Sequence, residues 1–231
     1  MAKPCLLYYI TDRKQLDGNE ETCRHRLLEK IAEAAQNGVD YIQLREKDLS
    51  ARELEELARE AVAAIYNGAS LRTEKRELGT TSQQRTRLLI NSRTDIALTA
   101  GAEGVHLRGE DVLPHDVREI LRATHQPPTT DDFLVAVSSH SADDVLRAEA
   151  ERADFTVFAP VFEKKAAPAA PATGLNALRE ACRANIPVLA LGGVTLDNAR
   201  SCLDAGAAGI AGIRLFQENN IADVVRALRN F

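Results

Sequence analysis

The sequence predicts an α/β protein, a single (β/α)8 TIM barrel that spans residues 1–231. Eight short apolar runs typical of strands alternate with eight segments whose apolar residues recur at helical spacing. The strand runs are apolar along most of their length, which is typical of parallel strands buried on both faces. A small-residue signature also recurs before three of the strands, at Gly38, Gly101 and Gly206. The last two lie four units apart, which gives about 26 residues for each strand and its helix, a suitable length.

Each predicted strand is a short run of aliphatic, β-branched or aromatic residues bounded by polar or turn residues. The first run, Cys-Leu-Leu-Tyr-Tyr-Ile, ends at the polar Thr11-Asp12-Arg13. In chain order, the strands are expected at 5–10, 41–44, 88–90, 104–107, 134–137, 155–158, 188–191 and 209–213. Because a helical segment follows every strand, the eight units favour a closed barrel over an open doubly wound sheet.

The helices are predicted by stripes of apolar residues three and four positions apart. They are expected at 27–35, 54–65, 96–100, 117–123, 145–150, 175–182, 199–203 and 221–228. Some of them carry local start and stop signals. Ser50, with Glu53 three residues later, forms a capping box before the second helix, and Gly38 ends the first. Ser141 is expected to cap the fifth helix.

Residues 67–86 interrupt the regular spacing. This stretch is polar, contains Gly, Ser and Thr, and has no periodicity, so we expect a mobile insertion. It joins a helix to the next strand, which places it on the barrel face opposite an active site. The repeat of strand and helix continues after it, so we expect no domain boundary and no catalytic role there.

Charge and composition narrow the class of partner. The chain has 29 Lys and Arg against 34 Asp and Glu, a net charge of −5, and therefore no overall basic field for nucleic acid or an anionic membrane. The apolar runs are short, and the amino terminus lacks the apolar stretch of a signal peptide, so we expect a cytoplasmic protein. A small molecule is the favoured partner, and the oligomeric state, a homo-oligomer included, is left open.

The four cysteines lack the spacing of a zinc site and are expected to be reduced.

The active site of such a barrel lies at the carboxyl ends of the strands, so the polar residues there are the candidates. Gln43, Arg45 and Lys47 lie at the end of the second strand and share one side of it by strand alternation. Two cations and an amide that converge at the barrel mouth suit a phosphate or pyrophosphate.

Two glycine-containing turns near the end of the chain favour a second anion site. Gly192 and Gly193 follow the seventh strand and open a helix, whose amino-terminal N–H groups attract anions. Phosphate often binds at the loops after strands seven and eight of these barrels. Arg214 follows the eighth strand and is a further candidate for that phosphate.

Other strand ends offer groups for metal and proton chemistry. Asn91 follows the third strand. Glu110 and Asp111 follow the fourth, and these two acids could hold Mg²⁺ together with substrate phosphates. Adjacent acids are also common in solvated loops, so the metal and the surface interpretation both stay open. His140 follows the fifth strand and is the best candidate for proton transfer. His106 lies inside a strand and is expected in the core.

Taken in order, these motifs resemble the thiamine phosphate synthase and thiazole tautomerase (TenI-like) family along nearly the whole chain outside the insertion. The matching segments are Tyr9-Ile10-Thr11-Asp12, Gln43-Leu44-Arg45-Glu46-Lys47, Ile90-Asn91, Asp95-Ile96-Ala97-Leu98, Gly104-Val105-His106-Leu107, Glu110-Asp111, Val137-Ser138-Ser139-His140-Ser141, Pro160-Val161-Phe162, Gly192-Gly193-Val194-Thr195 and Gly206-Ala207-Ala208-Gly209. The resemblance carries the barrel fold with it.

The resemblance implies thiamine biosynthesis. It implies a transferase that couples hydroxymethylpyrimidine pyrophosphate to a thiazole phosphate, with Mg²⁺ assistance and release of pyrophosphate. By the same resemblance, Gln43, Arg45, Lys47 and Asn91 hold the pyrimidine pyrophosphate, Asp111 is a magnesium ligand, Ser138 lines the site, and Gly193 and the turn after the eighth strand bind the thiazole phosphate.

Three departures from the family pattern concern the metal and the pyrophosphate. Family synthases usually carry Asn-Asp after the third strand, Pro-Thr-x-Thr-Lys after the sixth and Ser after the eighth. At these places this chain has Asn91-Ser92, Glu163-Lys164-Lys165-Ala166-Ala167 and Arg214. The loss of a carboxylate weakens metal binding, and Lys164, Lys165 or Arg214 are left to replace the missing pyrophosphate contacts.

Two alternatives to the synthase stay open. A thiazole tautomerase would isomerise a thiazole carboxylate phosphate by proton transfer through His140. Two of the departures, Glu163 in place of Pro and Ser92 in place of Asp, resemble that branch. Synthases often carry a histidine at the position of His140 too, and the intact motif at 43–47 favours the synthase, which we rank first. The third hypothesis is a non-catalytic barrel that binds thiazole phosphate or thiamine phosphate.

Overall fold

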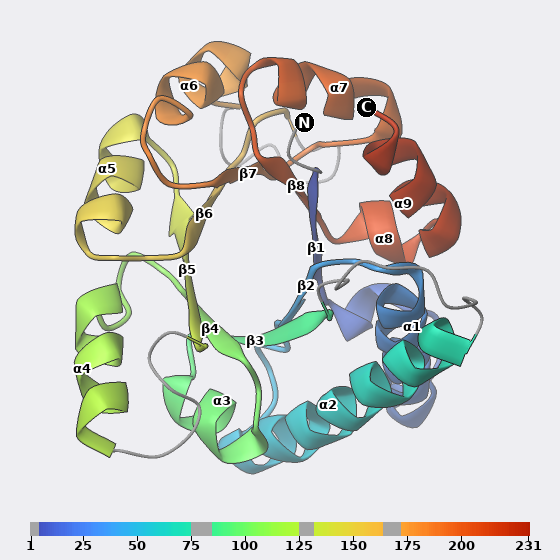
Figure 1. The fold of residues 1–231 in the computed structure, drawn as a ribbon. Coiled ribbons are helices and arrows are strands. Elements are labelled where there is room, and N and C mark those ends of the chain that lie inside the picture. Colours follow the sequence, from blue (N-terminus) through green and yellow to red (C-terminus); the bar gives the residue numbers. More distant parts are fainter. Residues whose placement is uncertain (1–4, 75–84, 125–131, 164–171) are drawn as a thin grey trace.

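The chain folds into a closed barrel of eight parallel strands that pair in chain order, with β8 pairing with β1 (Figure 1). This computed structural model describes residues 5–74, 85–124, 132–163 and 172–231. The strands are β1 (Leu6–Ile10), β2 (Tyr41–Leu44), β3 (Arg87–Asn91), β4 (Gly104–Leu107), β5 (Leu134–Ser139), β6 (Phe155–Phe158), β7 (Val188–Ala190) and β8 (Gly209–Gly212). The predicted (β/α)8 barrel is confirmed.

Helices surround the barrel (Figure 1). They are α1 (Glu20–Asn37), α2 (Ala51–Glu74), α3 (Thr94–Ala100), α4 (Pro114–Thr124), α5 (Ala142–Ala150), α6 (Gly174–Ala181), α7 (Leu196–Asp204), α8 (Arg214–Gln217) and α9 (Ile221–Arg229). A short 3₁₀ helix, η1 (Arg13–Gln15), follows β1. The sequence did not predict α8 or η1, because a single turn is too short to produce a periodic apolar pattern.

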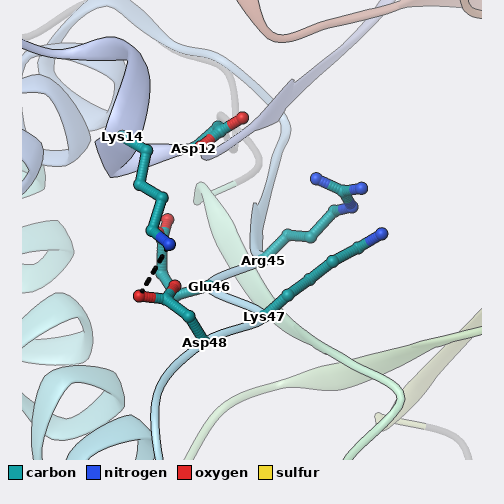
Figure 2. A pocket seen from close by; sticks show the side chains of 6 residues that line it. All are labelled: Asp12, Lys14, Arg45, Glu46, Lys47 and Asp48. Atoms are coloured by element: carbon teal, nitrogen blue, oxygen red, sulfur yellow. Dashed lines mark ion pairs between the residues drawn. The ribbon is translucent and has the colours of Figure 1, made fainter.

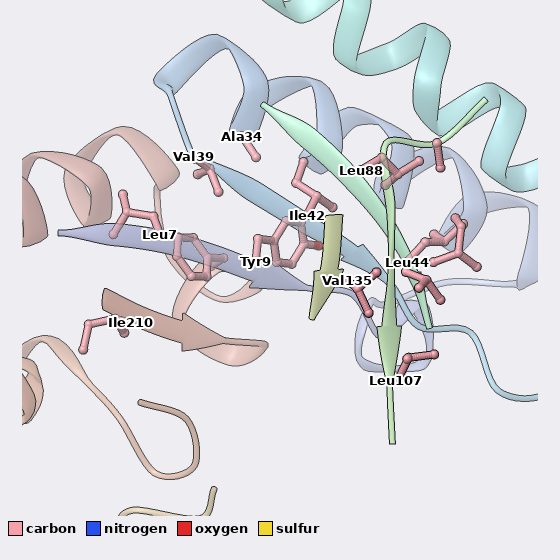
Figure 3. Packing of buried hydrophobic residues seen from close by; sticks show 14 of the residues in the cluster. Leu7, Tyr9, Ala34, Val39, Ile42, Leu44, Leu88, Leu107, Val135 and Ile210 are labelled. Atoms are coloured by element: carbon pink, nitrogen blue, oxygen red, sulfur yellow. The ribbon is translucent and has the colours of Figure 1, made fainter. Parts of the chain in front are cut away.

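The apolar core has two layers, as the alternation of strand side chains requires. Inside the barrel, the rings of Tyr41 on β2 and Phe155 on β6 stack with their centroids 4.8 Å apart. Between the strands and the helices lies a second cluster, to which Leu7 and Tyr9 belong (Figure 3). Each strand is therefore buried on both faces, as its near-continuous apolar sequence indicated.

Local signals fix several helix ends, among them the predicted ends at Gly38 and Ser141. The side chain of Asn19 accepts a hydrogen bond from the Thr22 backbone N–H at 2.9 Å and caps α1. Gly38 ends that helix with a left-handed φ of 81°, a conformation that glycine adopts without a steric penalty. Ser141 accepts from the Asp144 backbone N–H at 3.1 Å and caps α5.

The expectation for residues 67–86 is wrong in its first part, because α2 continues to Glu74. Gly68, a glycine of that stretch, lies on the helix. A Cβ atom there would come within 2.6 Å of the Ala32 carbonyl oxygen on α1, so this glycine lets the two helices pack closely. Residues 75–84 of the predicted insertion lie outside the described residues.

None of the helices in the described ranges combines the length and the apolar character that membrane crossing requires.

Candidate active site

Strand alternation and barrel closure bring the predicted residues to one rim. Gln43, Asn91 and Ser138 lie on the inward-facing alternation of β2, β3 and β5, near the carboxyl ends of these strands. Arg45 and His140 directly follow the ends of β2 and β5, and Gly193 lies three residues after the end of β7. Because all eight strands are parallel, their carboxyl ends form a single mouth.

An open cavity of about 330 Å³ lies beside the loop after β2. Its lining residues are Asp12, Lys14, Arg45, Glu46, Lys47 and Asp48. Figure 2 shows the long side chains of Arg45 and Lys47 extending in the same direction, away from Lys14, which forms an ion pair of 3.2 Å with Asp48. The shared direction of Arg45 and Lys47 agrees with the predicted alternation and gives this loop a cationic face.

The alternate residues of the same loop anchor it. The carboxylate of Glu46 is buried and accepts hydrogen bonds from Thr11 Oγ1 at 2.6 Å and from Arg13 Nη1 at 3.1 Å. Arg13, also buried, donates to Asp48 through Nη2 at 2.8 Å and holds the pKa of that carboxyl well below its usual value. Thr11 Oγ1 in turn accepts from the Arg45 backbone N–H at 3.0 Å. The anchored backbone directs the Arg45 side chain toward the mouth.

A hydrogen-bonded chain runs through the barrel interior below the mouth. Tyr8 Oη lies 3.0 Å from His106 Nδ1, and His106 Nε2 lies 2.8 Å from Ser138 Oγ. Burial, helped by the positive charge of Arg45, lowers the pKa of His106 from 6.5 to about 3. The imidazole is therefore neutral at physiological pH, and its one donor and one acceptor nitrogen suit the two neighbouring hydroxyls.

A second cluster joins the ends of β3 and β4. Arg108 donates through Nε to Ser92 Oγ at 2.8 Å and through Nη2 to Asp111 Oδ1 at 3.3 Å. Its backbone N–H donates to Asp111 Oδ2 at 2.7 Å. Asn91 Nδ2 donates to Ser92 Oγ at 3.1 Å, and Ser92 has a left-handed φ of 61°. The predicted metal ligand Asp111 is thus paired with an arginine.

His140, the predicted proton carrier, is exposed at the rim. Its Nδ1 lies 2.6 Å from the Ala159 carbonyl oxygen, which follows β6, and this contact fixes the orientation of the ring. Its backbone N–H donates to the Asp144 carboxylate at 3.0 Å, within the cap of α5. The contact with Ala159 therefore holds the imidazole at the mouth, and the contact with Asp144 holds the His140 backbone.

The turn after β7 packs tightly against the loop after β6. Gly192 and Gly193 have φ values of 94° and 64°. A Cβ atom on Gly193 would lie 2.8 Å from both the Glu163 carbonyl oxygen and Phe162 Cβ. Asn198, in the first turn of α7, donates to the Gly193 carbonyl at 3.0 Å. The turn therefore needs two glycines, and it leads directly into the amino terminus of α7.

The family described as thiamine monophosphate synthase, TMP-TENI, matches residues 7–216 of the chain. The chain belongs to this family. The predicted family and the prediction of an enzyme of the thiamine-phosphate synthase kind, in thiamine biosynthesis, are confirmed.

Relatives of the thiamine monophosphate synthase family cover nearly the whole chain. A putative thiamine-phosphate synthase 2 of Aquifex aeolicus is 38% identical over 213 residues, which is 92% of this chain and 97% of the relative. A thiamine-phosphate synthase of Caldanaerobacter subterraneus is 35% identical over 229 residues, 96% of this chain and 93% of the relative. A solved structure, thiamine phosphate pyrophosphorylase from Pyrococcus furiosus, has a TM-score of 0.74 and 26% identity, with coverage of 99% and 95%.

The residues that depart from the usual synthase pattern have the following places in the fold. Ser92 is held by Arg108, and Arg214 lies at the start of the short helix α8. Lys164 lies outside the described residues. Within the described ranges, no group of three or more His, Cys, Asp or Glu side chains is arranged to hold a metal ion.

Several residues around this synthase-family site were not predicted to act there. His106 is buried as expected, but it contacts the predicted site residue Ser138. Thr11 and Arg13 anchor the cationic loop, and Arg108 joins Ser92 to Asp111. The position of His106 two residues before Arg108, on the inward alternation of a barrel strand, was the available signal.

Proposed function

We propose that the chain joins a pyrimidine carrying a diphosphate to a thiazole phosphate and releases pyrophosphate, the reaction that its family resemblance implies. The observation that carries the proposal is the pair of cations Arg45 and Lys47, which extend together from an anchored loop at the barrel mouth of a family member (Figure 2). Gln43 and Asn91, on the inward alternation of β2 and β3, supply amides beside them.

The chemistry of the reaction explains why cations are needed. The thiazole nitrogen forms a bond to the methylene carbon of the pyrimidine, and the bond from that carbon to the diphosphate oxygen breaks. Negative charge grows on the departing oxygen in the transition state, where fixed cations stabilise it. In our proposal, Arg45 and Lys47 bind the diphosphate and carry out this stabilisation, and Ser138 lines the reacting centre.

The second substrate needs a separate phosphate site, and we assign it to the turn after β7. Gly192 and Gly193 let the backbone approach an anion closely, and the amino terminus of α7 contributes N–H groups and a favourable dipole. Arg214, at the start of α8, is our candidate for an additional cation at this site.

The family resemblance implies that Mg²⁺ assists the reaction. The side chains around Asp111, however, do not fit a magnesium ion held by the protein. Ser92 stands where a second carboxylate is usual, and the carboxylate of Asp111 is paired with Arg108. Mg²⁺ prefers carboxylates and substrate phosphates as ligands. We therefore derive no step through the metal, and the assignment of Asp111 as a magnesium ligand stays a prediction.

The test is turnover by the purified protein. The pyrimidine pyrophosphate and the thiazole phosphate are supplied with and without Mg²⁺, and thiamine phosphate is measured. We expect product formation, with Arg45→Ala lowering the rate by about a hundredfold or more, because it removes a charge that stabilises the leaving group. Arg52→Ala is the control, since Arg52 is exposed on α2 and pairs with Glu56.

Other outcomes identify the alternatives. No thiamine phosphate at any Mg²⁺ concentration would reject the synthase. Isomerisation of the thiazole carboxylate phosphate, abolished by His140→Ala, would indicate the tautomerase. Binding of thiazole phosphate without either product would indicate a non-catalytic barrel. A cytoplasmic location remains a prediction from the sequence.

A further inference from the structure

A guanidinium group occupies the place between Ser92 and Asp111 at the mouth. Arg108 reaches Ser92 Oγ through Nε at 2.8 Å and Asp111 Oδ1 through Nη2 at 3.3 Å. The Arg108 side chain is 53% exposed, whereas that of Asp111 is 12% exposed. The Arg108 guanidinium is therefore held by partners that lie deeper in the protein, and it remains accessible to solvent.

This cluster belongs to the same mouth as the cationic loop after β2. Asn91 on β3 pairs in register with His106 on β4, two residues before Arg108, and Asn91 donates to Ser92 Oγ. The charges of both Arg45 and Asp111 influence the pKa of the buried His106, so both lie within electrostatic reach of one imidazole. Arg108 is thus a third cation at the same barrel mouth as Arg45 and Lys47.

The pairing of Asp111 with Arg108 disfavours a metal ion held there by the protein. The Asp111 carboxylate accepts hydrogen bonds from the Arg108 backbone N–H at 2.7 Å and from Arg108 Nη2 at 3.3 Å. The guanidinium is therefore its counter-charge. A divalent cation on the Asp111 carboxylate would have to displace Arg108, with Ser92 and Asn91 as the neighbouring side-chain oxygen ligands.

We propose that Arg108 binds the diphosphate of the pyrimidine substrate and supplies there the positive charge that a protein-held magnesium ion would otherwise supply. The proposal rests on the proposed function. A guanidinium presents a planar fork of donors that matches phosphate oxygens, and it needs no metal ligands. The contacts to Ser92 and Asp111 hold that fork in place before the substrate arrives.

The neighbouring Arg93 provides a matched control. It lies one residue after Ser92, but both its Nε and its Nη2 donate to the carboxylate of Asp95. Like Arg108, it is an exposed arginine with a carboxylate partner. Its replacement removes the same charge from the same rim without touching the proposed contact.

The experiment is calorimetric titration of the full chain with inorganic pyrophosphate, in EDTA and in excess Mg²⁺. We expect the wild type and Arg93→Ala to bind pyrophosphate in EDTA. Arg108→Ala should bind about tenfold to a hundredfold more weakly there, the loss typical of charge-assisted hydrogen bonds. Arg108→Lys should recover only part of the affinity, because an ammonium lacks the planar fork. Thermal unfolding confirms that each variant is folded.

Two results would overturn the proposal: wild-type binding that appears only with Mg²⁺, or equal affinities of Arg108→Ala and Arg93→Ala. Production of thiamine phosphate in either case would leave the proposed function standing, so the two failures are distinguishable. Absence of pyrophosphate binding in every condition would overturn the role of Arg108 as well. If Mg²⁺ restores pyrophosphate binding to Arg108→Ala, this result would support the proposal that the arginine takes the place of a magnesium ion.

Discussion

Acid should destabilise this protein through one buried histidine. His106 is 2% exposed, and its ring contacts Tyr8 Oη and Ser138 Oγ. Burial, with the charge of Arg45, lowers its pKa from 6.5 to about 3 in the folded protein. Between these two values the unfolded chain binds a proton that the folded chain does not. Stability from this group is therefore complete above pH 6.5 and is lost progressively as the pH falls toward 3.

The magnitude follows from the pKa difference. A pH of 5 lies 1.5 units below the pKa of 6.5 that the histidine has in the unfolded chain. Each unit corresponds to about 1.4 kcal/mol, so the free energy of unfolding falls by about 2 kcal/mol. His106→Gln removes the titration. At pH 7 this variant should be less stable by about 1–3 kcal/mol, because Tyr8 Oη, fully buried, loses its imidazole partner. At pH 5 the two proteins should have nearly equal stability.

The assay is urea unfolding at pH 7 and pH 5, followed by circular dichroism. A difference of about 2 kcal/mol corresponds to roughly 0.7 M urea at a slope of about 3 kcal/mol/M. His115→Gln is the control. Its partner Glu151 raises the pKa of His115, which contributes stability below pH 6.5 and loses it as the pH rises. Its removal should therefore not reduce the acid sensitivity.

A parallel loss of stability in the wild type and in His106→Gln between pH 7 and pH 5 would refute the reasoning. It would mean that the folded protein accepts the proton on His106 at moderate acidity. An unchanged stability of His106→Gln at pH 7 would refute the second part, because the hydroxyl of Tyr8 would then not depend on the imidazole.

Three further predictions concern the cationic loop after β2, the turn after β7 and the cap of α5. Glu46→Ala should destabilise the protein by about 3 kcal/mol in urea unfolding, because it leaves the buried Arg13 without one of its carboxylates; a loss below 1 kcal/mol would show that Asp48 compensates. Gly193→Ala should raise the KM for thiazole phosphate at least tenfold, since the new Cβ would meet the Glu163 carbonyl at 2.8 Å and displace the turn; an unchanged KM would place the phosphate elsewhere. Ser141→Ala should cost about 1 kcal/mol of stability through the lost cap of α5, with activity retained; no change in melting temperature would contradict it.

The sequence predicts the strand order and the rim residues because both depend on local, periodic signals. The eight strands were predicted from short, nearly continuous apolar runs and from their alternation with helical stripes. The strand period of two places Gln43, Arg45 and Lys47 on one side of the β2 loop, and Figure 2 shows the last two extending together. The helix caps at Gly38 and Ser141 were also readable, because each uses hydrogen bonds between residues a few positions apart.

The extent of α2 could not be predicted in the same way. Gly68 disfavours a helix by its intrinsic propensity, and the residues around it are polar. The close approach of α1 reverses that preference, because the absence of a side chain at Gly68 makes room for the Ala32 carbonyl. A contact between residues 36 positions apart is invisible to a local pattern.

By itself, the sequence determined the barrel, the family and the end of the barrel at which the candidate site residues lie, since periodicity indicates which face of a strand each side chain occupies. Only the tertiary structure decided which side chains meet there. Barrel closure joined His106 to Ser138, Arg13 to Glu46 and Arg108 to Ser92, partners 32, 33 and 16 residues apart. Such pairs depend on strand register and on the exact path of each loop, and alternation along a single strand does not specify either.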